Sequence, residues 1–101
     1  MKSKLNFNQL IEMLLNGETE GISATGTLKL KGNLLIHYQT TIAERWNNKF
    51  IINFTRYSLP TGQLQKKLRT IIPDELQIIV GRVPINYGGS LVEYTKDENS
   101  K

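Results

Sequence analysis

The sequence predicts an α+β domain in which an antiparallel β-meander of three to five strands carries two helices on one face. Three kinds of pattern lead to this fold class: apolar residues at helical spacing, short segments that alternate apolar and polar residues, and tight-turn residues between segments. The chain length favours a single domain, residues 1–101, and we expect residues 1–5 and 96–101 to be disordered. A divergent winged-helix-like domain is one form that this class could take.

The first helix is expected to begin after Asn6. Asn6 is a favourable N-cap residue, and Gln9 three positions later completes a capping-box pattern. Gly17 supplies the C-terminal stop. Apolar residues recur on one side of the helix, namely Phe7, Leu10, Ile11, Leu14 and Leu15. We therefore expect this helix to cover a sheet or another helix.

Three strands are expected to form the meander, with a fourth strand and a short last strand after the second helix. Gly32-Asn33 and Asn47-Asn48 are two-residue turn signals that separate the first three strands. Residues 18–26 are polar and are expected to form a connection, and residues 82–89 are expected to form a loop. The expected strands are residues 27–31, 34–46, 49–55, 76–80 and 91–94.

The second helix is expected to follow the strand that begins at Lys49. Ser58 can cap the helix, Pro60 stops the strand, and Pro73 ends the helix near residue 72. Its apolar stripe consists of Leu64, Leu68, Ile71 and Ile72. The opposite side holds basic and amide side chains and no carboxylate, namely Gln63, Lys66, Lys67 and Thr70, with Arg69 on the flank.

The composition is that of an ordinary globular domain, with 39% hydrophobic and 22% charged residues. The chain has no cysteine, which excludes disulfides and thiolate metal sites and favours a reducing cytoplasm. Its apolar runs are too short for a membrane span, which requires about 18 residues. The first residues do not have the pattern of a signal peptide. We therefore expect a cytoplasmic protein.

The net charge of +4 is unevenly distributed along the chain. The stretch from Lys29 to Arg69 holds eight basic residues and one acidic residue, Glu44, whereas the rest holds five basic and eight acidic residues. A basic region of this kind is typical of a surface that binds a polyanion.

The sequence gives little support for catalysis. His37 is the only histidine and has no second ligand at metal-binding spacing, so a metal site is not expected. Ser58 lacks the surroundings of a nucleophile, and Gly88-Gly89 is unsuited to cradling a phosphate. We expect neither an enzyme nor a cofactor, and neither a small-molecule substrate nor a membrane partner.

Duplex DNA is the partner that the basic region favours. Lysine and arginine can contact phosphates, and asparagine or glutamine can read base edges. Trp46 and Tyr57 are interpreted as packing residues, so stacking on single strands is disfavoured. The candidate DNA-binding residues are Lys29, Lys31, Arg45, Asn47, Asn48, Lys49, Arg56, Gln63, Lys66, Lys67 and Arg69.

Three segments resemble a small domain common in phage and plasmid proteins. They are residues 37–43 (His-Tyr-Gln-Thr-Thr-Ile-Ala), residues 52–61 (Ile-Asn-Phe-Thr-Arg-Tyr-Ser-Leu-Pro-Thr) and residues 65–69. That domain carries a Tyr-x-x-Thr-x-Ile-Ala segment, then Tyr-Ser-x-x-Thr, then a helix ending in Leu-Arg, and it has no established activity. The resemblance implies a mobile genetic element. Small basic α+β proteins in that setting include winged-helix accessory proteins of conjugation, which bind an origin of transfer.

A winged helix normally has three helices before its wing, whereas one is expected here, which favours DNA reading by the β-hairpins. The sequence thus predicts a non-enzymatic DNA-binding protein of a plasmid or phage. We also expect a homodimer, paired through residues 78–80 and 91–92. The alternative is a protein-binding module, such as a phage or plasmid inhibitor of a host protein that uses the same basic face.

Overall fold

The structure is a computed structural model that describes residues 5–99, with side chains described through residue 95. The expectation of disorder in residues 1–4 and 100–101 lies outside the described residues. Leu5 forms a β-bridge with Ser23. The elements are α1 (Phe7–Leu15), β1 (Glu20–Ile22), β2 (Leu28–Lys31), β3 (Leu34–His37), β4 (Thr40–Trp46), β5 (Lys49–Asn53), α2 (Leu59–Ile71), the 3-10 helix η1 (Asp74–Leu76), β6 (Gln77–Val80) and α3 (Val92–Asn99).

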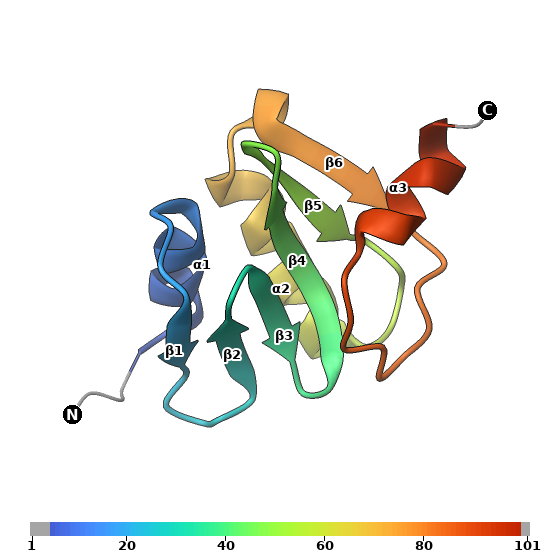
Figure 1. Cartoon of the computed structure of the whole chain (residues 1–101). Helices are drawn as coiled ribbons and strands as arrows, with labels where there is room; N and C mark the ends of the chain where they lie inside the picture. Colours follow the sequence, from blue (N-terminus) through green and yellow to red (C-terminus); the bar gives the residue numbers. More distant parts are fainter. Residues whose placement is uncertain (1–4, 100–101) are drawn as a thin grey trace.

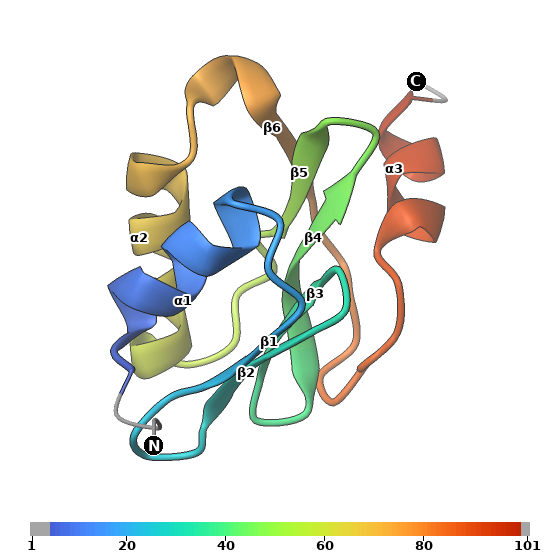
Figure 2. The same ribbon diagram turned by 60° about the vertical axis from the view of Figure 1, so that its left-hand side comes forward.

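All six strands form one sheet in sequence order, from β1 at one edge to β6 at the other (Figure 1). Neighbouring strands are antiparallel except β5 and β6, which run parallel because α2 crosses between them. Helices α1 and α2 lie on one side of this sheet, and α3 lies on the other (Figure 2). None of the helices in the described part of the chain has both the length and the apolar character to cross a membrane.

The α+β class, the antiparallel meander and the placement of two helices on one face are confirmed. The predicted strand number was too low, because residues 5–99 contain six strands. One missed strand is β1, in the region expected to be a polar connection, and it pairs with β2 from Glu20↔Lys31 to Ile22↔Lys29. The three-helix arrangement of a winged helix is not seen, since α2 packs flat against the sheet beside α1.

The expected strand 34–46 is divided by a tight turn at Tyr38 and Gln39, and its halves pair as β3 and β4. Tyr38 has a left-handed backbone with φ of 58°. A bulky residue seldom adopts this conformation. The turn consists of tyrosine and glutamine and has no glycine or asparagine, so the sequence does not mark it as a turn. The turns at Gly32-Asn33 and Asn47-Asn48 are confirmed.

The prediction of a strand at residues 91–94 was wrong, because this segment begins α3. Leu91 is fully buried and joins a second core on the α3 side of the sheet. The buried residues of this second core are Ile51, Val80, Val83 and Leu91. A leucine, a valine and a tyrosine near one another favour a strand. Here the outer side of the sheet requires a cover, and packing overrides that preference.

The first core lies between the sheet and helices α1 and α2. The capping box of α1 is confirmed, with the backbone N–H of Gln9 donating to Asn6 Oδ1 at 2.8 Å and the backbone N–H of Asn6 donating to Gln9 Oε1 at 2.8 Å. These caps begin a helix whose buried side packs on the strands. Fully burying each leucine or isoleucine is worth about 1.5–3 kcal/mol. The buried residues of α1 and the strands that meet there include Leu10, Ile11, Leu14, Leu28, Leu35 and Ile52.

Candidate nucleic-acid interface

The rotation of α2 on the sheet is fixed by a buried polar side chain. Ser58 caps the helix by accepting a hydrogen bond from Thr61 N–H. One turn later, the Gln65 amide donates to the carbonyl oxygens of Asn53 and Thr55, each at 2.8 Å. Because Gln65 is buried and its bonds end on the strand-to-helix connection, the helix cannot rotate without leaving polar groups unpaired. Leu64 and Leu68 are therefore held against the sheet.

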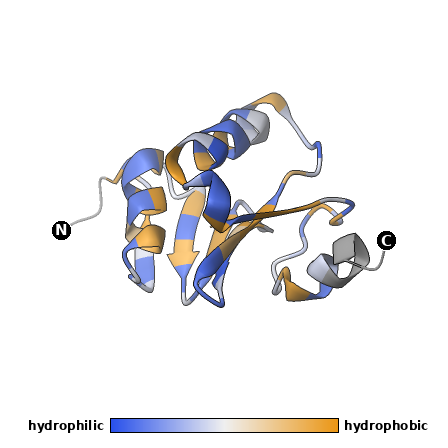
Figure 3. Cartoon of the chain, turned by 90° about the horizontal axis from the view of Figure 1, so that it is seen from above, coloured by the Kyte–Doolittle hydropathy of each residue, from blue (hydrophilic) through white to orange (hydrophobic). Residues whose placement is uncertain are grey.

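The opposite side of α2, which we call the α2 basic face, consists of the exposed residues Gln63, Lys66, Lys67 and Thr70. Gln63 and Lys67 form one row along the helix, and Lys66 and Thr70 form the adjacent row, since residues four apart are neighbours. Figure 3 shows hydrophilic residues recurring along α2. The helix contains no carboxylate from Leu59 to Ile71, so no residue of α2 itself neutralises the two ammonium groups.

Lys67 also borders a hollow of about 520 Å³ beside the start of α1, where Asn6 and Asn8 form part of the wall. The α2 basic face therefore continues toward α1. Asn6 is already committed to the capping box, whereas Asn8 is exposed. The region that the structure brings together around α2 is thus broader than the sequence indicated, but it contains only two free lysines.

Arg69 is exposed but partly committed to the fold. Its guanidinium carbon lies 5.4 Å from the centre of the Phe54 ring, and its Nε donates to Gln77 Oε1 at 2.8 Å. The Gln77 amide in turn donates to the carbonyl oxygens of Arg69 and Ile72. Arg69 therefore holds the end of α2 against the start of β6.

Arg45, one of the candidate DNA-binding residues, is directed toward α1 instead of away from the molecule. Its guanidinium donates to the carbonyl oxygen of Leu14, to that of Glu18 at 3.3 Å and to Asn33 Oδ1 at 3.0 Å. The carbonyl groups at the end of a helix have no partner within the helix, so a cationic fork at this position caps α1. Arg45 thus connects α1 to the turn between β2 and β3, and both of its terminal nitrogen atoms donate to these groups.

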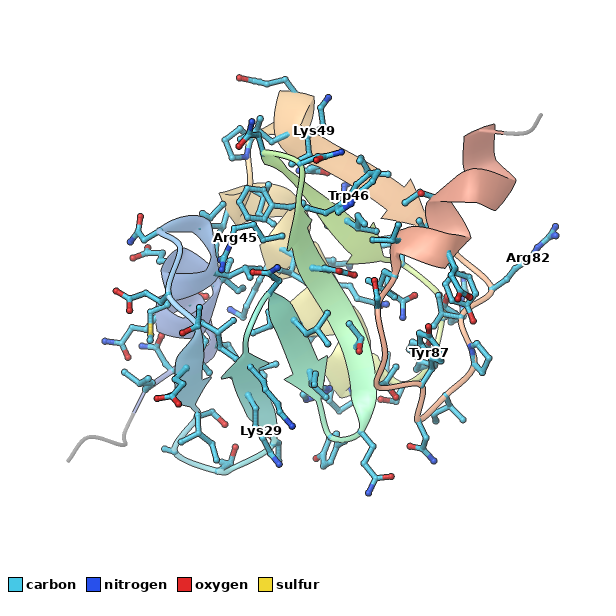
Figure 4. All side chains as sticks on the ribbon, viewed as in Figure 1. Lys29, Arg45, Trp46, Lys49, Arg82 and Tyr87 are labelled. Atoms are coloured by element: carbon cyan, nitrogen blue, oxygen red, sulfur yellow. The ribbon has the colours of Figure 1, made fainter. Side chains whose placement is uncertain are left out.

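Lys29 and Lys31 lie on the side of β2 opposite to α2. Leu28 and Leu30, which alternate with them, are buried in the first core. Figure 4 shows Lys29 and Lys49 near opposite ends of the sheet, with Arg45 directed toward α1. The strand lysines and the α2 basic face therefore belong to different sides of the molecule, and the expected single basic surface is not formed.

The turn between β4 and β5 places Asn47, Asn48 and Lys49 at an exposed tip. Both asparagines have left-handed backbones, with φ of 53° and 64°. Successive positive φ values define the hairpin turn that asparagine and glycine favour, so backbone geometry alone accounts for both residues. Arg56 is exposed in the connection between β5 and α2.

The two aromatic residues interpreted as packing residues are half-buried in the structure. Trp46 packs against the second core. The Tyr57 hydroxyl accepts a hydrogen bond from the Asn53 amide at 3.0 Å and donates to the carbonyl oxygen of Val83. Because both groups are held by neighbours, they do not form an open stacking platform.

The sequence analysis did not single out Arg82. It is exposed, has a left-handed backbone with φ of 62°, and extends outward from the loop after β6 (Figure 4). The signal for it was weak, because a single arginine in a loop rich in proline and glycine is a common surface residue. Within residues 5–99, no group of three or more histidine, aspartate and glutamate side chains gathers as metal ligands would.

Comparisons with protein-family models, with curated proteins and with solved structures find no match for this chain. The resemblance to the phage and plasmid domain therefore stays a prediction. The fold and the site define an α+β domain in which a firmly anchored helix presents a basic face without carboxylates.

Proposed function

We propose that this chain is a non-enzymatic DNA-binding protein that contacts duplex phosphates through the α2 basic face. The observation that carries the proposal is the pair Lys66 and Lys67, both exposed on a helix without a carboxylate and anchored by Gln65. A rigid helix can present two ammonium groups to a phosphate backbone without first having to be ordered. Gln63, in the same row as Lys67, offers an amide that can pair with a base edge.

This proposal differs from the expectation that the β-hairpins contact the DNA. Lys29 and Lys31 lie on the other side of the sheet, so they do not contact the same stretch of duplex as α2. Arg45 is engaged with α1 and has no part in the contact. The tip of the sheet holds Asn47, Asn48 and Lys49. Arg56 precedes α2 by a few residues and is the basic residue nearest to the start of the helix in sequence.

Two lysines give only modest affinity, so we also propose that the protein acts as a homodimer. No strand of the described residues pairs with the outer side of the last strand, β6, and this side could pair with the same strand of a second copy. Leu91, which was expected to take part, is buried instead. Sedimentation at tens of micromolar should give the mass of two chains, and the mass of one chain would contradict the dimer.

The setting that we propose is the cytoplasm of a bacterium, with a plasmid or phage as the source. The absence of cysteine from the sequence supports a reducing compartment. The resemblance of residues 37–43 and 52–61 to a domain of mobile elements supports the source.

The test is a salt titration of binding to random and native-locus duplexes, measured by fluorescence anisotropy. Each phosphate contact contributes about 1 to the slope of log affinity against log salt, so Lys66→Ala with Lys67→Ala should lower the slope by about 2. The matched control is Lys29→Ala with Lys31→Ala, which removes the same charge from the other side of the sheet. We expect the control to retain the slope of the unmodified protein.

Equal losses in the two double variants would contradict the proposal, because they would indicate attraction by net charge alone. An affinity unchanged by Lys66→Ala with Lys67→Ala would also exclude α2. A protein inhibitor that uses the basic face should show no preference for the native locus, and this outcome would favour the protein-binding alternative.

A further inference from the structure

A pocket of about 610 Å³ lies at the end of the sheet where β3 turns into β4. Its lining comes from four parts of the chain: the start of β2 with the residues before it, the β3–β4 turn with the start of β4, the start of α2 with the residue before its cap, and the loop after β6. The volume falls in the range of about 300–1,000 Å³ that is usual for small-molecule sites. None of the α2 lysines lines it, so it is distinct from the α2 basic face.

The rim of the pocket carries apolar side chains that the fold leaves uncovered. Tyr38 is 62% exposed and Ile85 is 67% exposed, and both line the pocket. Ile42 and Tyr57 form part of the same lining from the sheet and from the segment before α2. A concave site with an apolar rim and wall gains free energy when a flat apolar ring covers it.

The rim is held in place by the backbone. Tyr38 has φ of 58° and Asn86 has φ of 68°, so each projects from a left-handed position. Asn86 N–H donates to Thr40 Oγ1 at 2.7 Å, which connects the loop after β6 to the start of β4. The two sides of the opening are therefore fixed relative to each other before any ligand binds.

The polar part of the lining is organised around His37, which is only 4% exposed. Its Nδ1 lies 3.2 Å from Thr61 Oγ1, and Ser58 Oγ donates to the same oxygen at 3.1 Å. Burial lowers the pKa of His37, so the ring is neutral at neutral pH. The ring edge also contacts Tyr38, with centroids 4.6 Å apart.

The electrostatic character of the pocket is positive. Lys29 is the one charged side chain among the residues that line it, and the lining contains no carboxylate. Ser58 and Thr61 belong to the beginning of the 13-residue helix α2, where the helix dipole is positive. A highly charged ligand would need several cations, and the lining has one, Lys29. The pocket therefore suits a ligand that combines an apolar part with a single anionic group.

We propose that this pocket binds a small aromatic anion, with its ring against Tyr38, Tyr57 and Ile85 and its carboxylate or phosphate near Lys29. The proposal does not rest on DNA binding, because its residues are separate from the α2 lysines. The sequence analysis expected no small-molecule ligand, since the lining residues are scattered over the chain and meet only in the fold.

The experiment is a titration of the ¹⁵N-labelled chain with naphthalene-2-carboxylate and with naphthalene-2-carboxamide, followed by amide chemical shifts at pH 7. The two probes share a ring and differ in charge. We expect both to shift the amides of the pocket residues and the carboxylate to bind about tenfold more tightly, since a charge-assisted hydrogen bond exceeds a neutral one by about that factor.

Variants separate the charge from the ring. Lys29→Gln should abolish the preference for the carboxylate and leave carboxamide binding unchanged. Its matched control is Lys31→Gln, two residues along the same strand and outside the pocket lining, which should keep the preference. Tyr38→Asn should weaken both probes, because asparagine tolerates the left-handed backbone and removes the ring. Ile85→Ser tests the other side of the rim in the same way.

Equal affinities for the two probes would overturn the assignment of an anion, and shifts confined to residues outside the pocket would overturn the site. The same loss of preference in Lys31→Gln as in Lys29→Gln would show that only net charge acts. Inorganic phosphate that binds as tightly as the carboxylate would overturn the aromatic part of the proposal.

Discussion

The carboxylate of Glu44 accepts a hydrogen bond from the backbone N–H of Leu91 at 2.6 Å, although the two residues lie 47 positions apart in sequence. The Ser90 hydroxyl lies 2.9 Å from the same carboxylate oxygen, and it also accepts a hydrogen bond from Val92 N–H. Glu44, in the middle of β4, is buried. This carboxylate thus fixes the beginning of α3 on the sheet.

The first prediction follows from this contact. Glu44→Ala should destabilise the protein by about 1–3 kcal/mol, because the buried Leu91 N–H loses its acceptor. Urea unfolding measures this loss. In the Glu44→Ala variant, hydrogen exchange should be faster for the backbone amides of α3 than for those of α1. Glu93→Ala, which changes an exposed carboxylate on α3, should stay within about 0.5 kcal/mol of the unmodified protein. Similar costs for the two variants would contradict the docking role of Glu44.

The second prediction concerns Arg45. Arg45→Ala should cost about 1.5–3 kcal/mol of stability, since hydrogen bonds to a charged group are lost at the end of α1 and at Asn33. Its affinity for DNA should remain that of the unmodified protein. Lys49→Ala is the control, because Lys49 is exposed at a turn and should have little effect on stability. Weakened DNA binding by a stable Arg45→Ala protein would return Arg45 to the interface.

The third prediction tests whether the tip of the sheet reads DNA sequence. Asn47→Gly and Asn48→Gly keep a turn whose positive φ values glycine adopts easily, and they delete both amides. Because the contact is proposed at α2, each variant should keep its preference for the native locus over random duplexes in a binding competition. A loss of roughly 1–3 kcal/mol on the native site alone would instead assign base reading to this hairpin.

The fourth prediction is a dependence of stability on pH. Burial holds the pKa of His37 below its ordinary value in the folded state. The unfolded chain therefore takes up a proton near pH 6.5 that the folded chain does not, and the free energy of unfolding should fall as the pH drops below about 6.5. The fall should level off below the folded pKa of His37.

The measurement is the free energy of unfolding between pH 8 and pH 5 for the unmodified protein and for His37→Gln. The variant has no group that titrates at this position, so its curve should be flatter in this window even if its overall stability is lower. The same slope in both proteins would assign the dependence to other groups.

Helix caps and tight turns could be predicted from the sequence, because they depend on residues that are close to one another in the chain. The capping residues Asn6 and Ser58 act on neighbours within the same turn, and the turn at Asn47-Asn48 uses residues that tolerate positive φ. Such preferences are intrinsic to the residue, so they act in the same way in any fold. The starts of α1 and α2 and two of the tight turns were correctly located for this reason.

Features that depend on distant parts of the chain could not be predicted in the same way. The turn at Tyr38 uses a residue that disfavours its own backbone conformation, and the loop after β6 packs beside it through Asn86. The guanidinium of Arg45 caps a helix that ends about thirty residues earlier in sequence. A basic residue that serves the fold and one that serves a ligand look the same in sequence, which is why the candidate residues include Arg45, whose guanidinium binds the end of α1.

The parallel pairing of β5 with β6 has a consequence for the order in which the protein folds. The hairpins from β2 to β5 join residues close in sequence and can form within microseconds, whereas β6 can dock only after α2 has crossed the sheet. The second core needs Val80 from β6 and Leu91 beyond it, so it must close last. We therefore expect a nascent chain that ends before residue 77 to form the first core and to leave the other face of its sheet, including Ile51, open to solvent or to a chaperone.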